Sequence, residues 1–213
     1  MTREKIIYAL GFFDGVHLGH QALLTACRHM AQEQGGFAGA VTFDTHPETL
    51  VAGHAPALIN TIEDRARLLL SFGITELTLL PFNEELRSLP WQDFLELLLQ
   101  KGASGLVCGD DFRCGFKGLG NAESIQGYCR EKNLPCTVIP EQSLDGTRIS
   151  STLIRGLIVR GDMDSATNFL GHPHILTGTV VPGQQLGRKL GIPTANLVIP
   201  EGIVVPKFGV YVC

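Results

Sequence analysis

Two histidines stand three residues apart in the stretch GFFDGVHLGH, which covers residues 11–20. An apolar run typical of a buried strand precedes it, and a stretch with helical spacing of apolar residues follows. His17 and His20 should therefore share one face in the first turn of a helix, where free backbone N–H groups and the helix dipole favour a phosphate. Gly15 and Gly19 leave room for a ligand to approach the backbone. A hydrogen bond from an imidazole to phosphoryl oxygens would stabilise a transition state by about 2.7–4 kcal/mol.

Two other interpretations of this histidine pair stay open. The rings could cap the helix or face solvent, which is the simpler explanation for a lone histidine. A zinc pair is the other alternative, although the sequence offers no obvious third ligand. We favour the phosphate interpretation because the histidines follow a strand and an Asp-Gly turn.

A second group of candidate anion ligands lies in the stretch RISSTLIR. Ser150, Ser151 and Thr152 are expected to begin a helix, with Arg148 before it and Arg155 one turn in. Hydroxyls, free N–H groups and a guanidinium together suit a phosphate. The alternative is an ordinary N-cap, which serine and threonine often supply. If both helix starts face one crevice, they could hold a polyphosphate.

Polar and aromatic residues also follow two other expected strands, where they could hold a planar ring: Asp44, Asp111, Phe112 and Phe116. The alternative is that these loops carry turn residues only. The chain has neither the G-x-G-x-x-G pattern of dinucleotide-binding proteins nor the G-x-x-x-x-G-K-[ST] pattern of P-loop kinases. A nicotinamide dehydrogenase and a P-loop kinase are therefore poorly supported.

The stretch LGRKLGIPTANL, residues 186–197, is the last candidate site. Two glycines bracket two cations, and Thr194 and Asn196 follow a proline. Hydroxyl and amide oxygens in alternation could serve a magnesium ion and phosphates. The alternative is a hairpin corner built from turn residues.

The elements that must position these residues alternate between strand and helix. Apolar runs predict strands over 5–10, 37–43, 76–82, 105–109 and 136–141, and helical spacing predicts helices over 18–34, 61–73, 91–102, 121–133 and, as a pair, 149–171. Strands that are apolar on both sides predict a parallel sheet with helices on both faces. Ligands of such sheets bind beyond the carboxyl ends of the strands, so the chemistry is expected in the loops after residues 10, 43, 82, 109 and 141.

The composition and the periodicity of the sequence change after Gly171. The remaining residues are rich in glycine, proline and β-branched side chains and lack a helical period, which predicts an all-β segment. We therefore expect one α/β domain over 1–171 and part of a second domain over 172–213.

Composition limits the class of protein. The formal net charge is −4 and no basic block is present, which weighs against a nucleic-acid partner. No run of 18 apolar residues and no signal-peptide pattern occurs, so we expect no membrane association and a cytoplasmic location. The six cysteines form no C-x-x-C pair, so free thiols are expected. Nothing in the sequence indicates an oligomeric state.

The quoted stretches occur in a familiar order. The chain resembles the bacterial bifunctional riboflavin kinase/FMN adenylyltransferases, or FAD synthetases. The resemblance rests on five stretches, which occur in this order: GFFDGVHLGHQALL, VTFDTHP, GDDFR, ISSTLIR and GRKLGIPTANL. The resemblance implies a Rossmann-like nucleotidyltransferase domain of the H-x-G-H superfamily, followed by a riboflavin kinase β-barrel. It implies conversion of riboflavin to FMN and of FMN to FAD, with ATP and Mg²⁺ in each step. Thr45 and Leu153 depart from the family's usual proline and arginine.

The resemblance also implies roles for individual residues. His17 and His20 resemble the histidines that act at the ATP α-phosphate, and Ser151, Thr152 and Arg155 resemble the phosphate-holding element, assisted by Arg148. The residues implied for ATP binding are Gly11, Phe12, Phe13, Asp14, Gly15, His17, Gly19, His20, Arg148 and Ser151. Those implied for the flavin are Asp44, Asp111, Phe112 and Phe116. Thr194 and Asn196 match the family's metal and phosphate site of the kinase, with Thr194 as the Mg²⁺ ligand.

The kinase barrel is expected to be incomplete in these residues. No acidic residue follows Glu201, so the catalytic base that the resemblance implies is missing, and we expect FAD formation from FMN without FMN formation from riboflavin. Residues 172–213 are expected to be mobile, with Val204, Val205, Val210 and Val212 exposed. The alternatives are an H-x-G-H nucleotidyltransferase with another acceptor and a non-catalytic flavin- or nucleotide-binding remnant. A class I aminoacyl-tRNA synthetase is disfavoured by the short length and acidic balance.

Overall fold

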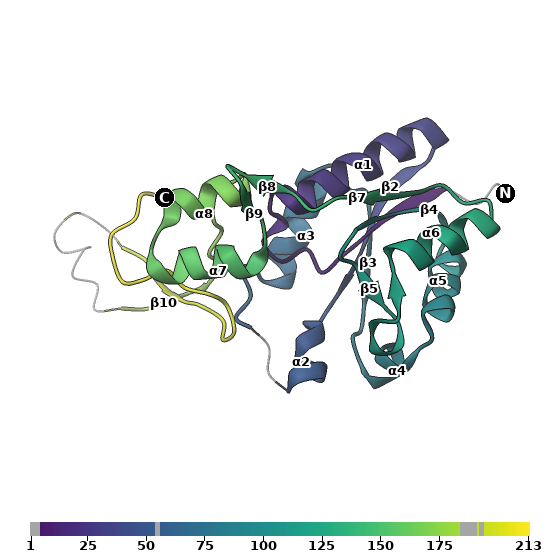
Figure 1. Cartoon of the computed structure of the whole chain (residues 1–213). Coiled ribbons are helices and arrows are strands. Elements are labelled where there is room, and N and C mark those ends of the chain that lie inside the picture. Colours follow the sequence, from purple (N-terminus) through teal and green to yellow (C-terminus); the bar gives the residue numbers. More distant parts are fainter. Residues whose placement is uncertain (1–4, 54–55, 184–190, 192–193) are drawn as a thin grey trace.

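A five-stranded parallel sheet forms the centre of the computed structural model (Figure 1), which describes residues 5–53, 56–183, 191 and 194–213. The strand order is β3-β2-β1-β4-β7, and every neighbouring pair is parallel. The strands are β1 (Ile6–Leu10), β2 (Phe37–Phe43), β3 (Glu76–Leu80), β4 (Ala103–Gly109) and β7 (Cys136–Ile139). The expected parallel sheet is therefore confirmed, with β1 at its centre and the reversal of strand order between β1 and β4.

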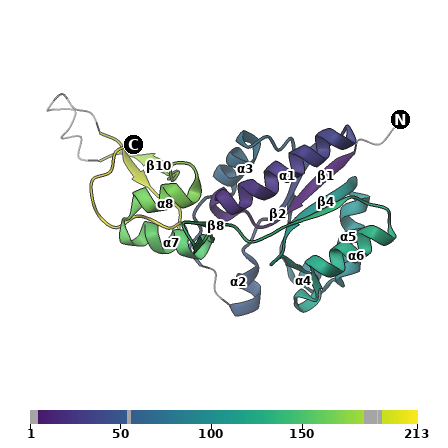
Figure 2. The ribbon, with the colours of Figure 1, turned by 45° about the horizontal axis from the view of Figure 1, so that its top comes forward.

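Helices cover both faces of this sheet, because successive residues of β1 point to opposite sides and all are apolar. Ile7 and Ala9 pack with α1 (Leu18–Gln34) and α3 (Ile62–Ser71). Tyr8 and Leu10 pack with α5 (Trp91–Gln100) and α6 (Ala122–Glu131). Figure 2 shows the two pairs of helices on opposite sides of the strands.

The short elements of the fold were not predicted from the sequence. These are the helices α2 (Pro47–Ala52) and α4 (Glu84–Ser88), the 3-10 turns η1 (Asp14–Val16) and η2 (Phe116–Gly118), and the two-residue strands β5 (Arg113–Cys114), β6 (Gly120–Asn121), β8 (Ser143–Leu144) and β9 (Thr147–Arg148). Strands of two residues cannot show the period of two that identifies a strand in sequence.

The pair of helices expected over residues 149–171 is present as α7 (Ser151–Arg160) and α8 (Met163–Leu170). These helices form a third apolar cluster with Ile59, and Val204 from the tail joins it. Leu58 bridges to Ile203: the Leu58 N–H donates to the Gly202 carbonyl at 2.6 Å and the Val204 N–H donates to the Leu58 carbonyl at 2.8 Å. The tail therefore contacts the α/β region directly.

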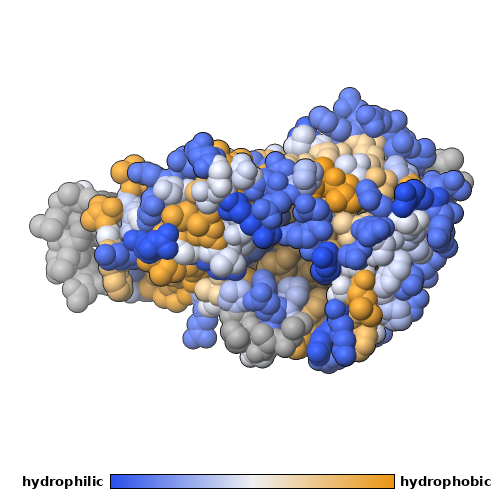
Figure 3. Space-filling view, in the orientation of Figure 1, coloured by the Kyte–Doolittle hydropathy of each residue, from blue (hydrophilic) through white to orange (hydrophobic). Residues whose placement is uncertain are grey.

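This contact corrects one expectation about the tail. Val204 is 3% exposed because the bridge at Leu58 places it over α7 and α8, so the expectation that it stays open is wrong. Val205, Val210 and Val212 are 49%, 101% and 105% exposed, as expected. Figure 3 shows apolar side chains at the surface of the end of the molecule that carries the tail.

The tail forms one short antiparallel ladder between β10 (Thr179–Val181) and β11 (Asn196–Val198), consistent with the start of a β domain. Of the stretch LGRKLGIPTANL, residues 186–190, 192 and 193 lie outside the described residues. Thr194 and Asn196 are described and exposed. The boundary near residue 172 and the mobility of the tail stay predictions.

Two further expectations concern the chain as a whole. The six cysteines are all free thiols, as expected. In the part of the chain that the structure describes, no helix combines the length and the apolar character needed to span a bilayer.

Candidate active site

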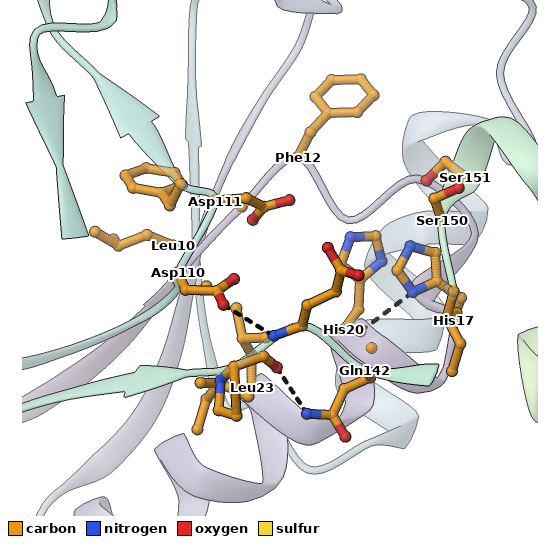
Figure 4. Close-up of a pocket in the computed structure, with 18 of the residues that line it drawn as sticks. Leu10, Phe12, His17, His20, Leu23, Asp110, Asp111, Gln142, Ser150 and Ser151 are labelled. Atoms are coloured by element: carbon orange, nitrogen blue, oxygen red, sulfur yellow. Dashed lines mark hydrogen bonds between the residues drawn. The ribbon is translucent and has the colours of Figure 1, made fainter. Parts of the chain in front are cut away.

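A cavity of about 380 Å³ opens at the carboxyl end of the sheet, beside the ends of β1 and β4 (Figure 4). Four of the five loops expected to carry chemistry contribute to it; the loop after residue 82 does not. The cavity is lined by Leu10, Gly11, Phe12, His17, Gly19, His20, Leu23, Phe43, Pro47, Gly109, Asp110, Asp111, Phe112, Arg113, Ile139, Pro140, Glu141, Gln142, Arg148, Ile149, Ser150 and Ser151.

His17 and His20 lie side by side at the start of α1. His17 is the N-cap, and its Nδ1 accepts a hydrogen bond from the His20 backbone N–H at 3.3 Å. The two rings are stacked, with centroids 3.7 Å apart and planes 12° from parallel. The shared face is therefore confirmed, and the capping alternative is correct for one nitrogen of His17. Because Nδ1 accepts, a neutral His17 ring carries its proton on Nε2, which remains a donor.

Both imidazoles are kept neutral by their surroundings. The pKa of His17 is lowered from 6.5 to about 4, mainly by burial and to a smaller extent by the charge of His172, while a hydrogen bond with its own backbone opposes the change. Burial also lowers the pKa of His20, with smaller contributions from the charges of His17 and Arg65. A neutral ring can still donate one hydrogen bond, so the pair offers donors without a fixed charge of its own.

The low pKa of His17 predicts that stability falls with acid. The ring has a pKa of about 4 in the folded chain and 6.5 as its ordinary value, so below pH 6.5 the unfolded chain binds the proton first. Stability is then lost as the pH falls from 6.5 towards 4. We expect His17→Asn, which keeps a helix cap, to remove about 2 kcal/mol of the difference between pH 7 and pH 5. Urea unfolding of both proteins at the two pH values measures this, and an unchanged difference would contradict it.

The start of α7 faces the same cavity. Ser150 is its N-cap and accepts a hydrogen bond from the Leu153 N–H at 3.2 Å, while the Ser151 hydroxyl donates to the Asp14 carbonyl at 3.0 Å. Figure 4 shows Ser150 and Ser151 beside the two histidines. The structure thus brings the two predicted helix starts to one crevice, as a polyphosphate would require.

Arg148 reaches the cavity but is paired there. Its Nη2 contacts the Asp111 carboxylate at 3.1 Å and its Nε contacts the Glu141 carboxylate at 2.8 Å. All three side chains are exposed at the rim. An incoming phosphate would therefore compete with two carboxylates for this guanidinium.

Asp14, Thr152 and Arg155 bond to one another instead of lining the cavity. The buried Asp14 carboxylate accepts from the Ile59 N–H at 2.8 Å, from the Asn60 N–H at 3.4 Å and from Arg155 Nη1 at 2.9 Å. Arg155 Nη2 donates to the Thr152 hydroxyl at 3.1 Å. Burial raises the pKa of Asp14, and the hydrogen bonds and the charge of Arg155 oppose that rise. These contacts tie α7 to the turn before α1.

That turn is strained, and side chains from several elements hold it. Phe13 and Val16 have φ of 60° and 40°, in the left-handed region that non-glycine residues avoid. Gln21 Nε2 donates to the Val16 carbonyl at 2.9 Å and to the Leu170 carbonyl at 2.7 Å. His172 Nε2 lies 2.9 Å from the Gly15 carbonyl oxygen. Phe13 itself is buried in the core, and neither Phe13 nor Gly15 lines the cavity.

The expected flavin residues divide into two sets. Asp111 and Phe112 line the cavity. Asp44 is exposed and accepts a hydrogen bond from the Phe82 N–H at 2.9 Å, and Phe116 is 46% exposed; neither lines the cavity. Sequence reasoning missed the apolar residues Leu10, Leu23, Phe43 and Ile139 as part of the wall, because strand and helix positions of this kind look like ordinary core.

Few side chains in the structure could act as ligands of a metal ion. Within the described ranges, no group of three or more histidine, cysteine, aspartate or glutamate side chains is placed to hold a metal ion, and this includes the alternative of a zinc ion at the histidine pair. Thr194 and Asn196 offer one hydroxyl and one amide oxygen, whereas Mg²⁺ takes about six oxygen ligands. These two residues could supply at most two of those ligands, and phosphate oxygens and water would supply the rest. We derive no step through a magnesium ion held by the protein.

Comparison with known proteins identifies two matching families. A family model for FAD synthetase matches residues 1–153, and one for riboflavin kinase matches residues 170–213. The bifunctional riboflavin kinase/FMN adenylyltransferase of Listeria monocytogenes is 33% identical over 208 residues, which cover 96% of this chain and 66% of that protein. The protein of the same name from Bacillus subtilis is 32% identical over 212 residues, covering 98% and 67%.

A solved structure agrees with the fold. The crystal structure described as a macrolide-efflux protein from Streptococcus pneumoniae is 31% identical, with a TM-score of 0.84, and the match covers 97% of this chain and 68% of that one. The chain therefore spans about two thirds of the length of the proteins that it matches.

Proposed function

Because the chain belongs to the FAD synthetase family, we propose that it transfers the adenylyl group of ATP to FMN. An oxygen of the FMN phosphate attacks the α-phosphorus of ATP. The bond from that phosphorus to the bridging oxygen breaks, and pyrophosphate leaves with the electron pair. FAD is the other product. The observation that carries the proposal is the stacked, neutral His17–His20 pair at a helix start inside the cavity.

In this proposal the histidines stabilise charge on the α-phosphate. His17 Nε2–H and the ring of His20 donate to its non-bridging oxygens, on which negative charge increases as the nucleophile adds. Neither ring needs to lose or gain a proton, which agrees with pKa values lowered by burial. The free N–H groups at the start of α7, beside Ser150 and Ser151, hold the β- and γ-phosphates.

The apolar part of the cavity is the proposed place for the flavin ring. Phe12 and Phe112 provide aromatic faces, and Leu10, Leu23 and Ile139 provide the aliphatic wall. Any magnesium ion enters with the ATP phosphates as part of the substrate. Asp14, Thr152 and Arg155 act as positioning residues, because their side chains bond to one another.

Two further proposals concern the rest of the chain. We propose that residues 172–213 are the first part of a riboflavin kinase module in which Thr194 and Asn196 contribute to the phosphate cradle, on the basis of the family match to residues 170–213. We also propose a cytoplasmic location, which agrees with six free thiols.

The direct experiment mixes the purified chain with ATP, FMN and Mg²⁺ and follows both products. We expect FAD and pyrophosphate in equal amounts. If pyrophosphate is released only with a different acceptor, that acceptor replaces FMN in the proposal. If ATP and FMN bind but no product forms, the non-catalytic alternative is favoured.

A further inference from the structure

Arg65 is a buried cation that the proposed mechanism does not use. It lies on α3 and is 2% exposed. Its Nη1 donates to the Phe12 carbonyl and its Nη2 donates to the Phe43 carbonyl, both at 2.8 Å. Phe43 ends β2, and Phe12 follows the end of β1. One planar guanidinium therefore bridges the carboxyl ends of two neighbouring strands of the sheet.

These contacts fix the wall of the cavity. Phe12 and Phe43 both line it. The Arg65 guanidinium also lies over the Phe12 ring, 4.3 Å from its centroid, and the Thr42 hydroxyl donates to the Phe12 carbonyl at 2.8 Å. The next residue, Phe13, begins the strained turn that leads to His17. Strain of this kind persists only where the surrounding structure holds the backbone in place. Arg65 does so by bonding to the Phe12 carbonyl, immediately before the strained turn.

Keeping a cation at this place is costly. The Arg65 Nε atom is buried without a hydrogen-bond partner, and burial lowers the pKa of the guanidinium while the charges of Asp14 and Asp44 oppose that change. Among the residues that the structure describes, no carboxylate lies within ion-pair distance of it. A methionine would fill a similar volume without this cost, so the bridge between the carbonyls requires an explanation beyond packing.

We propose that Arg65 is a positioning residue that holds the turn carrying His17 and His20 in place against the ATP phosphates. The inference rests on the proposed adenylyl transfer. The planar fork of arginine matters here, because the single ammonium of lysine cannot reach both carbonyls with the same geometry. A turn that shifts by even 1 Å would misplace the donors, and such errors cost up to about 100-fold in rate.

The test compares three variants of the full chain: Arg65→Met, Arg65→Lys and, as the matched control, Arg67→Met. Arg67 lies on the same helix, its side chain is 73% exposed, and it pairs with Asp64 at 3.4 Å. We expect kcat for FAD formation to fall at least about tenfold in both Arg65 variants, with a smaller change in KM. Arg67→Met should keep the wild-type kcat.

A histidine titration followed by NMR adds a readout that packing alone would not move. The charges of His17 and Arg65 both lower the pKa of His20, so Arg65→Met should raise this pKa and Arg65→Lys should leave it near the wild-type value. An active wild type with an unchanged kcat in Arg65→Lys overturns the inference. If Arg65→Met does not fold, the kcat of Arg65→Lys alone decides whether the inference holds. A wild type that forms no FAD overturns the proposed function itself.

Discussion

Replacing His20 with alanine should lower the rate of FAD formation at least about 100-fold while the fold is retained. The ring lies in the cavity, stacked on His17 at 3.7 Å, and provides a donor at the proposed α-phosphate position. Such a donor acts as charge develops, so kcat should fall more than the affinity for ATP. His17→Ala should give a loss of the same size.

Two further variants separate chemistry from structure. His17→Asn keeps a side chain that can accept the hydrogen bond from the His20 N–H, so a rate loss in this variant is not caused by loss of the helix cap. His29→Ala changes an exposed histidine on the same helix and should leave the rate unchanged. Steady-state kinetics with circular dichroism as the folding control provides the measurement. Near-normal turnover in both His17→Ala and His20→Ala would remove the pair from the mechanism.

Asp14→Ala should destabilise the folded chain by about 3–5 kcal/mol, the usual cost of leaving one member of a buried ion pair alone. Its carboxylate is 3% exposed and accepts from Arg155 and from the backbone of Ile59 and Asn60. Removing it leaves a half-buried guanidinium and two backbone donors without their partner. Chemical denaturation of the variant and the wild type measures the difference.

A double-mutant cycle with Arg155 tests the reason for this loss. Asp14→Ala and Arg155→Ala together should cost clearly less than the sum of the single changes, because the double variant no longer contains an unpaired buried charge. Asp14→Asn should lie between wild type and Asp14→Ala, since its amide oxygen can still accept from Ile59. Strictly additive losses would show that the pair does not couple α7 to the turn. Arg155→Ala should also slow adenylyl transfer, through the position of the start of α7.

The parts of the site that could be predicted are those with local signals. The spacing of His17 and His20 and the Ser150 cap follow from helix geometry within four residues, and the structure has both. The sheet was predictable because its strands are apolar on both faces, a pattern that the two apolar clusters around β1 explain.

The parts that could not be predicted depend on distant contacts. Asp14 stands within the glycine-rich stretch and looks like a ligand of the phosphate, yet it pairs with a residue 141 positions away. Nothing local indicates that Phe13 and Val16 adopt positive φ. Both side chains are buried in one cluster with Leu68 and Leu69 of α3, which are distant in the sequence. Val204 is hydrophobic like its neighbours, and only the bridge from Leu58 to Ile203 decides that it is buried.

The transfer of label from ATP tests the central claim most directly. The purified chain is incubated with FMN, Mg²⁺ and ATP labelled with ³²P at either the α- or the γ-phosphate, and the products are separated. The account predicts that the α-label appears in FAD and the γ-label in pyrophosphate, and that both products form at least about 100-fold more slowly in His20→Ala. Label from the γ-phosphate in a flavin product, or α-label that stays in free AMP while FMN is unchanged, would contradict it.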